Sequence, residues 1–479
     1  MNPISLGTRR ELFWDDYLVN TSRTSAALRQ HEPRIEEISL TFDKPWEGDG
    51  CDYFAILRPG EKYLMYYLAW HMYSKDLTRH TADIANICLL ESSDGIRWER
   101  PELGVTEFDG SLSNNIIAKS RDDELGSMDN FTPFLDTNPD CPADERIKAT
   151  VGFDHNRQPE LWCYCSGDGV HFRKGWLMTR RGKFDTQNVA FWDGARGEYR
   201  CYIRDFHNYS DNWANNGVRD IRCMTSKDFR TWSDPVPLDF GGGDDIPLYT
   251  NAVSIYPRAP QMLIGFPSRY IERHEWTPNY DQLPGAECRK MRMKLNPRYG
   301  LAITDCVLMT SRDGGHWNRW DEAWMRPGAE RVYNWVYGDC YPSVGFIPTP
   351  SDLELAPDEY SMFCPEKHWS NEPAKLRRYS IRQDGFISRG AGYAGAQVVT
   401  KPVTFEGGRL HLNFSTSAAG WIRVAVCARG ETLRSCELFG DSLDRVVSFD
   451  GDLAALAGKE VTLEFTLCDA DLYSMQFSD

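Results

Sequence analysis

Several features that would each indicate another class of protein are missing from the sequence. No apolar stretch approaches the roughly 20 residues of a membrane-spanning helix, and no long segment carries apolar residues at helical spacing. The first residues have no apolar core of the kind found in signal peptides. Basic residues are fewer than acidic ones, which leaves a formal net charge of -16. We therefore expect no nucleic-acid and no membrane partner, since both require a basic surface.

Paired cysteine motifs are also missing. The chain has 14 cysteines but no CxxC pair, and several lie inside expected strands. This pattern indicates buried thiols in a reducing compartment, without a disulfide framework or a metal site. We expect a cytoplasmic protein that needs no cofactor and no catalytic metal. A structural Ca²⁺ held by Asp and Asn oxygens is left open, as is the oligomeric state.

The chain is rich, however, in a short repeated motif, Ser-x-Asp-Gly-x-x-Trp. Copies with small changes begin at Ser92, Ser166, Ser226 and Ser311, and a degenerate fifth copy begins at Arg382. The motif suits a tight turn, because Asp accepts hydrogen bonds from backbone amides and Gly adopts the left-handed conformation. The aromatic residue would then bury the turn against the next unit. One supersecondary unit used five times is therefore predicted.

Strand-like runs precede each copy in the same order. The third run ends at the turn, the second is rich in aromatics, and the first runs lie at 53–57, 131–135, 188–192, 251–256 and 341–346. With an outer fourth strand, each unit becomes a four-stranded sheet, and five such sheets arranged radially make a five-bladed β-propeller. We predict an all-β protein in which residues 1–384 form this propeller.

The pattern changes after the fifth copy. A glycine-rich link leads into alternating apolar and polar runs separated by Gly, Asp and Ser turns, which predicts a C-terminal β-sandwich over residues 385–479. This domain would either bind carbohydrate or only pack on the propeller, and we favour packing. Within an N-terminal strand segment, 1–40, the stretch 11–19 would either close the ring or pack on the sandwich.

Polar residues gather at the strand ends that should meet on the propeller axis. The starts of the first strands carry Asp52, Asp129, Asn130, Asp185, Gln187, Asn188, Tyr249, Thr250, Asn251 and Asp339. The ends of the second strands carry Trp70, His71, Arg204, Asp205, Arg269, Glu272, Glu366 and His368. Exposed strand ends are often polar for structural reasons alone. So many acidic, amide, Arg, His and aromatic groups at one end of a channel nevertheless predict a site for a polyhydroxylated ligand.

Glycosidic cleavage requires two carboxyl groups across the scissile bond, one neutral acid and one anion, with pKa values held apart. The residues expected at this end of the channel include four candidates for these roles: Asp52, Asp185, Asp205 and Glu366. Because Arg204 adjoins Asp205 in the sequence, we expect Asp205 to stay ionised and either to hydrogen-bond the ligand or to stabilise the transition state.

This architecture, with an Asp at the start of blade one, resembles the propeller glycosidases of the invertase, levansucrase and arabinanase type. The resemblance implies that Asp52 is the nucleophile or base and that Asp129 stabilises the transition state. It also implies a Glu acid in blade three, where this chain instead has Asp185, Gln187 and Asn188. The stretches 12–18, 130–139 and 185–192 resemble more closely a group of bacterial proteins labelled only invertase-like, which brings no substrate.

Other signatures of the invertase family, the Trp-Met-Asn-Asp-Pro-Asn-Gly segment and the Glu-Cys pair, are missing. The acid must then be Glu366, Glu272 or Asp185. We favour Glu366, because it ends an apolar strand where partial burial would raise its pKa.

Three functions are compatible with these residues. The first is a glycoside hydrolase that removes a terminal sugar, with a furanoside among the options, from an oligo- or polysaccharide. The second is a phosphorylase of the same fold, with phosphate held by a basic cluster of Arg269, Arg273, His274, Arg289 and Lys290. A solvated loop is the simpler interpretation of the basic run 289–294. The third is a non-catalytic carbohydrate-binding propeller. Sugar identity, anomer, stereochemistry and exo or endo action stay open.

Overall fold

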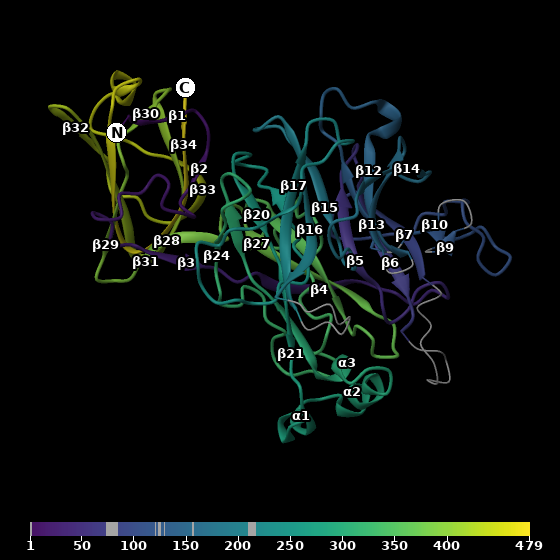
Figure 1. The fold of residues 1–479 in the computed structure, drawn as a ribbon. Helices are drawn as coiled ribbons and strands as arrows, with labels where there is room; N and C mark the ends of the chain where they lie inside the picture. The colour runs from purple at the N-terminus through teal and green to yellow at the C-terminus, as the bar shows by residue number, and fades with distance from the viewer. Residues whose placement is uncertain are drawn as a thin grey trace.

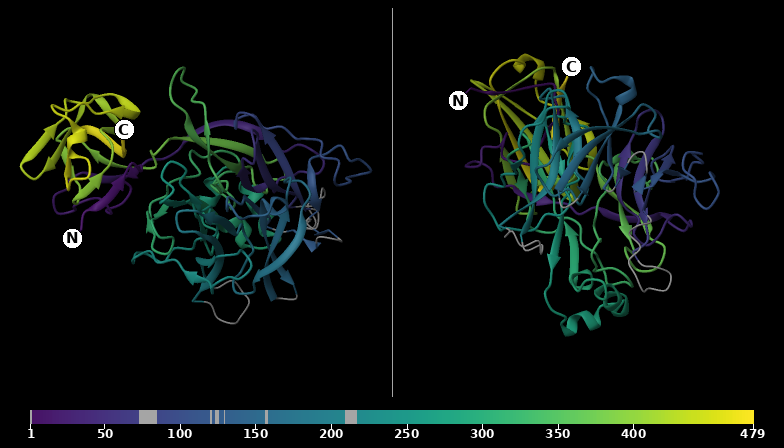
Figure 2. Two further views of the ribbon diagram at one scale, coloured as in Figure 1. Left: turned by 90° about the horizontal axis from the view of Figure 1, so that it is seen from above. Right: turned by 45° about the vertical axis from the view of Figure 1, so that its right-hand side comes forward.

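The computed structural model confirms the five-bladed propeller and the C-terminal β-sandwich (Figure 1). It describes residues 2–72, 85–119, 121–122, 126–128, 130–155, 158–208 and 217–479. Seen from above, the sandwich lies to one side of the propeller and is joined to it by two extended segments (Figure 2). No helix in these ranges is long and apolar enough to span a membrane.

Each blade is a four-stranded sheet. Blade I contains β5 (Asp52–Leu57), β6 (Tyr63–Trp70), β7 (Ala85–Ser92) and β8 (Ile116–Lys119), and blade II contains β11 (Thr132–Leu135), β12 (Ile147–His155), β13 (Gln158–Ser166) and β14 (Arg173–Thr179). Blade III contains β15 (Val189–Asp193), β16 (Glu198–His207), β17 (Val218–Ser226) and β18 (Val236–Pro237). Blade IV contains β19 (Ser254–Ile255), β20 (Leu263–Gly265), β23 (Met309–Ser311) and β24 (Asn318–Arg319). A short pair, β9 (Arg121–Asp122) and β10 (Gly126–Ser127), lies between blades I and II in the sequence, and the 3-10 turn η1 (Ala143–Glu145) precedes β12.

The ring closes in two places. Blade V contains β25 (Ile347–Thr349), β26 (Glu359–Glu366) and β27 (Lys375–Arg382), and its outermost strand is the N-terminal β4 (Arg34–Thr41), which pairs antiparallel with β27. Near the axis, the amide of Ile56 donates to the carbonyl of Val344 at 2.9 Å, and the amide of Val344 donates to the carbonyl of Phe54 at 2.8 Å. The first and last blades are thus joined at both the outer and the inner edge.

The repeated motif forms the expected turn. In the first copy, Asp94 Oδ1 accepts hydrogen bonds from the amides of Ile96 and Arg97, each at 2.8 Å. Gly95 has a φ of 74°, and Trp98 is buried. The copies at Asp168, Asp228 and Asp313 make the same pair of amide contacts. Because these bonds lie within a few residues, the motif specifies its turn locally.

The stretch 11–19 joins the sandwich, and a later strand of the N-terminal segment closes the ring. While β4 closes the ring, three earlier strands join the sandwich: β1 (Ile4–Gly7) pairs with β30 (Val403–Phe405), β2 (Glu11–Leu12) with β34 (Thr462–Ser478), and β3 (Ala27–Gln30) with β28 (Ile387–Ala391). The other sandwich elements are β29 (Ala396–Val399), β31 (Arg409–Ala428), β32 (Glu431–Arg434), β33 (Asp441–Val446) and η2 (Leu453–Leu456). The boundary at residue 385 stays a prediction.

The degenerate fifth turn connects the two domains. Asp384 is buried and accepts hydrogen bonds from Tyr256 Oη at 2.6 Å, Arg258 Nε at 3.0 Å and Ser474 Oγ at 2.7 Å. Arg10 lies 3.3 Å from its second oxygen. Burial alone would raise the pKa of Asp384, but the two arginines and these hydrogen bonds lower it. This copy therefore gives up the usual turn contacts and connects the propeller to the sandwich.

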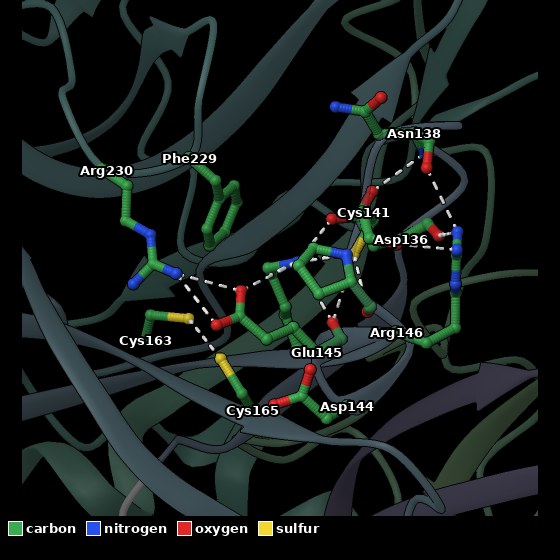
Figure 3. Close-up of polar contacts among 12 residues, drawn as sticks. Asp136, Asn138, Cys141, Asp144, Glu145, Arg146, Cys163, Cys165, Phe229 and Arg230 are labelled. Carbon is green, nitrogen blue, oxygen red and sulfur yellow. Dashed lines mark hydrogen bonds and ion pairs between the residues drawn. The ribbon is translucent and has the colours of Figure 1, made fainter.

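A second buried polar cluster joins blades II and III (Figure 3). Lys148 Nζ donates to Asp136 Oδ2 at 2.6 Å and to Cys141 Sγ at 3.0 Å, and both charged side chains are buried. Arg230, which lies within the third turn motif, binds both oxygens of Glu145 at 2.9 and 3.1 Å. The contacts hold the turn of blade III against blade II.

Helices are confined, in the described part of the propeller, to an insertion in blade IV and the short turn η1. The hairpin of β21 (Ser268–Glu272) and β22 (Ala302–Cys306) extends away from the blade and carries α1 (Pro278–Gln282), α2 (Ala286–Met293) and α3 (Arg298–Leu301) at its tip (Figure 1). The run 289–294 is thus mostly helix, although its sequence suggested a solvated loop. Arg289 and Arg292 are buried there and donate to the backbone carbonyls of residues 334–335 and 368–369.

Candidate active site

A cavity of about 260 Å³ lies where the five blades meet. Residues from every blade and from the helical insertion line it: Asp52, Tyr53, Leu68, Trp70, Ala85, Asn130, Asp185, Arg204, Arg219, Tyr249, Tyr270, Arg298, Tyr299, Tyr337 and Trp369. A lining shared by all five blades places the cavity on the propeller axis. Aromatic rings make much of its wall, with a few charged groups among them.

Asp52 is the more deeply buried of the two carboxyl groups in this lining. It is the first residue of β5, and only 3% of its surface is exposed. Burial raises the pKa of Asp52 well above its usual value, and a hydrogen bond from the Trp70 side chain opposes this only in part. Removing a carboxylate from water without a cation beside it favours the protonated form. Burial therefore favours the neutral, protonated form of Asp52 at the wall of the cavity.

Asp185 supplies the second carboxyl group, in a different environment. Its side chain is 80% exposed and lies 3.7 Å from Arg204, measured between Oδ2 and Nη2. Arg204 is buried, and its Nε donates to the carbonyl of Lys183 at 2.8 Å. One carboxyl group of the cavity is thus buried and neutral, while the other is solvated and paired with an arginine.

The aromatic wall is linked by phenol groups. The hydroxyl of Tyr249 lies 3.1 Å from that of Tyr53 and accepts a hydrogen bond from Tyr337 at 3.2 Å. Trp369 packs edge-on against Trp70, with ring centroids 5.5 Å apart. Such a wall offers flat apolar faces and hydroxyl groups together, which suits a sugar ring.

Six of the residues predicted from the sequence line this cavity: Asp52, Trp70, Asn130, Asp185, Arg204 and Tyr249. Asp129 lies outside the described residues. His71 is exposed and is not among the lining residues.

Three predicted amide residues hold backbone in place and do not face the cavity. The amide nitrogen of the Gln187 side chain donates to the carbonyl of Tyr53 at 3.0 Å, which ties blade III to the start of β5. Asn188 Oδ1 accepts from the amide of Arg204 at 3.3 Å. Asn251 Nδ2 donates to the carbonyl of Tyr202 at 3.2 Å. These residues position the backbone that carries the site.

Asp205 does not have the environment expected from its sequence neighbour. Successive strand residues point to opposite faces, so Arg204 points toward Asp185 whereas Asp205 lies 3.1 Å from Arg222. Burial raises the pKa of Asp205, and the amide of Phe206 and Arg222 oppose this only in part. Asp205 is not a lining residue of the cavity. The expectation that Arg204 keeps it ionised is therefore corrected.

Glu366 also differs from its expected role as the acid. Its Oε1 accepts hydrogen bonds from Arg377 Nε at 2.9 Å and from Arg331 Nη1 at 3.0 Å. Partial burial acts to raise the pKa of Glu366, as the sequence suggested, but the two arginines outweigh it and lower the pKa. A carboxylate held ionised in this way is not suited to donate a proton.

Four further predicted residues lie outside the cavity. Arg269 forms a two-point ion pair with Asp305, at 2.7 and 2.5 Å, and lines a separate hollow beside the helical insertion. Glu272 ends the same strand, β21. Asp339 is buried and accepts a hydrogen bond from the amide of Val336 at 2.9 Å. His368 is buried behind Asp52.

The basic cluster proposed for phosphate does not form at the axis. Arg269, Arg273 and His274 line the separate hollow, Arg289 is buried among backbone carbonyls, and Lys290 pairs with Glu287 at 3.1 Å. Within the described ranges, no group of three or more His, Cys, Asp or Glu side chains is placed to hold a metal ion. The 14 cysteines are free thiols, most of them buried.

Several lining residues were not predicted from the sequence: Arg219, Tyr270, Arg298, Tyr299, Tyr337 and Trp369. A signal for Arg219 was present, because the start of a third strand lies beside the end of the second. Arg219 is paired with Phe206 in the ladder of β16 and β17, at the same edge as Arg204. Arg298 and Tyr299 come from the helical insertion, and no strand pattern could have indicated them.

Neither a family model nor a curated protein matches the sequence. Among solved structures, an N-acetylgalactosamine deacetylase from F. plautii is 14% identical, with 78% of this chain and 96% of that chain covered and a TM-score of 0.42. An endo-arabinase from Bacteroides thetaiotaomicron is 11% identical, with 72% and 98% covered and a TM-score of 0.40. An α-L-arabinofuranosidase of Fusarium graminearum is 9% identical, with 76% and 92% covered and a TM-score of 0.38. Values this low assign no activity to the chain.

Proposed function

We propose that this protein is a glycosidase that removes a terminal sugar from an oligo- or polysaccharide in the central cavity. The observation that carries the proposal is the contrast between Asp52 and Asp185. One carboxyl group is buried, which favours its protonated form, and the other is exposed and paired with Arg204. Glycosidic cleavage needs such a pair, an acid and an anion whose environments hold their pKa values apart.

In the proposed reaction, Asp52 is the general acid. Its proton passes to the glycosidic oxygen as the bond to the anomeric carbon breaks, which makes the leaving group neutral. The carboxylate of Asp185 either attacks the anomeric carbon or takes a proton from the attacking water. These roles differ from those implied by the invertase resemblance, in which Asp52 is the nucleophile or base. The difference rests on burial, because a protonated carboxyl group cannot act as a nucleophile.

The size of the cavity supports action on a chain end. Ligand pockets that bury a drug-sized molecule span roughly 300–1,000 Å³, whereas this cavity measures about 260 Å³. It therefore suits a single sugar ring, and the aromatic wall supplies the stacking faces. A longer glycan would extend from the mouth of the cavity.

Phosphorolysis is the second candidate, and one observation favours it. Arg219 and Arg298 line the cavity itself, unlike the basic residues suggested by the sequence. An inorganic phosphate in place of water would be held by such side chains.

A hydrolysis screen on aryl glycosides and oligosaccharides tests the proposal. Each substrate is assayed with and without phosphate, for the wild type and for the Asp52→Asn, Asp185→Asn and Glu366→Gln variants. On the oligosaccharides, whose leaving groups are poor, we expect the two Asp variants to lose at least a hundredfold in kcat/KM, on the order of what proton transfer contributes. Glu366→Gln, which lies in an ion pair away from the cavity, should retain activity within a few-fold.

Three other outcomes lead to different conclusions. Turnover that requires phosphate would identify a phosphorylase. Retained sugar binding without any turnover would leave a carbohydrate-binding propeller. Loss of activity in Glu366→Gln but not in Asp52→Asn would return the acid role to Glu366.

A further inference from the structure

The central cavity is rich in arginine for such an acidic chain. The protein has a formal net charge of -16, yet the lining residues include three arginines and two aspartates. Charged side chains in a cavity act on a ligand more strongly than the same charges in water, because the local dielectric constant is lower. The ratio of arginine to aspartate in the lining therefore influences whether the cavity accepts a charged or a neutral ligand.

Arg219 is the most distinctive of the three. It is 6% exposed, and its guanidinium carbon lies 4.0 Å from the ring centre of Tyr270. Its Nε is buried and has no hydrogen-bond partner among the residues that the structure describes. Arg219 comes from β17 and shares an edge of blade III with Arg204 from β16. Stacking holds the guanidinium in place while part of its hydrogen-bonding capacity is unused.

Arg298 lines the same cavity from the helical insertion, and its guanidinium carbon lies 5.3 Å from the ring centre of Tyr299. Burial raises the pKa of Tyr270, and the positive charges of Arg298 and Arg219 both act to lower it. Both guanidinium groups therefore belong to the lining of one cavity. The Nε of Arg298 is also buried without a hydrogen-bond partner in the described part of the chain.

The two aspartates of the cavity do not neutralise these arginines. Asp185 lies 3.7 Å from Arg204, and Asp52 is protonated and lies beside His368. Within the described ranges, neither Arg219 nor Arg298 has a carboxylate within ion-pair distance. Burying a cation without an anion costs free energy, and a ligand that brings a negative charge would offset that cost.

We propose that the cavity binds a negatively charged sugar, with the carboxylate of a uronic acid or the sulfate of a sulfated sugar held between Arg219 and Arg298. A guanidinium group presents its N–H donors in a planar fork that matches a carboxylate or sulfate. This inference rests on the proposed glycosidase function and narrows it to anionic glycans. The sugar ring would stack on the aromatic wall while its anionic group contacts the two arginines.

A binding measurement, which does not depend on turnover, tests the inference. Tryptophan fluorescence, which Trp70 and Trp369 should report, is titrated with D-galacturonate, D-glucuronate, glucose 6-sulfate, D-glucose and inorganic phosphate. We expect at least one charged sugar to bind tenfold or more tightly than glucose, and less tightly as salt is added. The titrations with the two uronates and with glucose 6-sulfate show separately whether the cavity binds a carboxylate or a sulfate. Preferential binding of phosphate over both would overturn the sugar assignment.

Matched variants locate the contact. Arg219→Gln and Arg298→Gln should each weaken binding of the charged sugar at least tenfold and leave glucose binding unchanged. Arg181→Gln, the same change in an exposed ion pair with Asp234, should alter neither. Unchanged binding of the charged sugar in both cavity variants would overturn the inference, as would equal affinity for glucose. Circular dichroism of each variant confirms that it folds.

Different results would contradict the glycosidase proposal and the anionic-sugar proposal. If neutral glycosides are hydrolysed and charged ones are not bound, the glycosidase stands and the anionic substrate is wrong. If charged sugars bind through the two arginines but no glycoside is cleaved, the anion site stands and the catalytic proposal is wrong.

Discussion

His368 Nδ1 lies 3.7 Å from Asp52 Oδ2, and both side chains are buried, at 1% and 5% exposure. Burial raises the pKa of Asp52 and lowers that of His368, and the charge of Arg292 lowers the latter further. The distance would allow an ion pair, but both shifts favour the neutral forms. Because each charge would have to leave water, we assign a protonated Asp52 beside a neutral His368.

The first prediction concerns the dependence of Asp52→Asn on the leaving group. A general acid matters most when the leaving group is poor, because a good leaving group departs without a proton. Asp52→Asn should therefore lose kcat/KM far more on an alkyl glycoside than on a dinitrophenyl glycoside. Steady-state rates on a series of leaving groups measure this. An equal loss across the series would assign Asp52 a role other than proton donation.

The same residue predicts the direction of the pH profile. Because the pKa of Asp52 is raised well above its usual value, kcat/KM should fall as the pH rises through that raised pKa. The alkaline limb should be absent in Asp52→Asn, whose residual rate depends on no such proton. Initial rates from about pH 4 to 10 test this, with stability checked at each pH.

Asp339 predicts a pH dependence of stability. Burial raises the pKa of Asp339 to about 7, while the amide of Val336 and Arg292 oppose the shift. Between the usual value of 3.8 and about 7, the native state holds a proton that the unfolded state has lost. The free energy of unfolding should therefore fall as pH rises through this window, by up to about 1.4 kcal/mol per pH unit.

Asp339→Asn removes that titration. Chemical denaturation at several values from about pH 4 to 8 should give a flatter curve than the wild type, with the variant gaining most above about pH 7. The exposed Asp358 provides the control, since Asp358→Asn should leave the wild-type slope intact. A slope unchanged in Asp339→Asn would mean that other groups cause it.

The buried contacts of Asp384 lead us to predict that removing its carboxylate weakens the connection between the two domains. Asp384→Ala would leave Arg258 and Arg10 without their shared carboxylate, and breaking a buried ion pair typically costs about 3–5 kcal/mol. We expect a lower unfolding midpoint and faster proteolysis between propeller and sandwich. Asp168→Ala, in an exposed copy of the same turn, should change the midpoint less and leave the proteolysis rate unaltered.

The buried contacts of Lys148 lead us to predict that the cluster between blades II and III contributes to the stability of the protein. Lys148→Met leaves Asp136 buried with only the hydroxyl of Tyr199, at 2.9 Å, and the amide of Asn138 to bind it. Stability should fall by about 3–5 kcal/mol. The double variant Lys148→Met, Asp136→Leu should recover part of this loss, because no lone charge remains. Denaturation midpoints measure the loss of stability in the two variants. An equal loss in the single and the double variant would contradict the explanation by a broken ion pair.

Local signals allowed the fold to be predicted from the sequence. The turn at Asp94 makes its hydrogen bonds within a few residues, so each blade could be recognised without knowledge of the others. Strand order then placed Asp52, Asp185 and Arg204 at one edge. The two roles of the N-terminal segment could not be separated, because β4 pairs with β27, which lies at the far end of the propeller sequence.

The number of blades, the C-terminal sandwich and part of the lining of the axial cavity can be read from the amino-acid order alone, because turns and strand alternation are short-range properties. Which carboxyl group is protonated, and which arginines face the ligand, depends instead on how the chain packs in three dimensions. Glu366 and Asp52 both end or begin apolar strands, yet two arginines hold Glu366 ionised while burial keeps Asp52 neutral. A pKa depends on the groups within a few ångströms in space, and those groups come from distant parts of the chain.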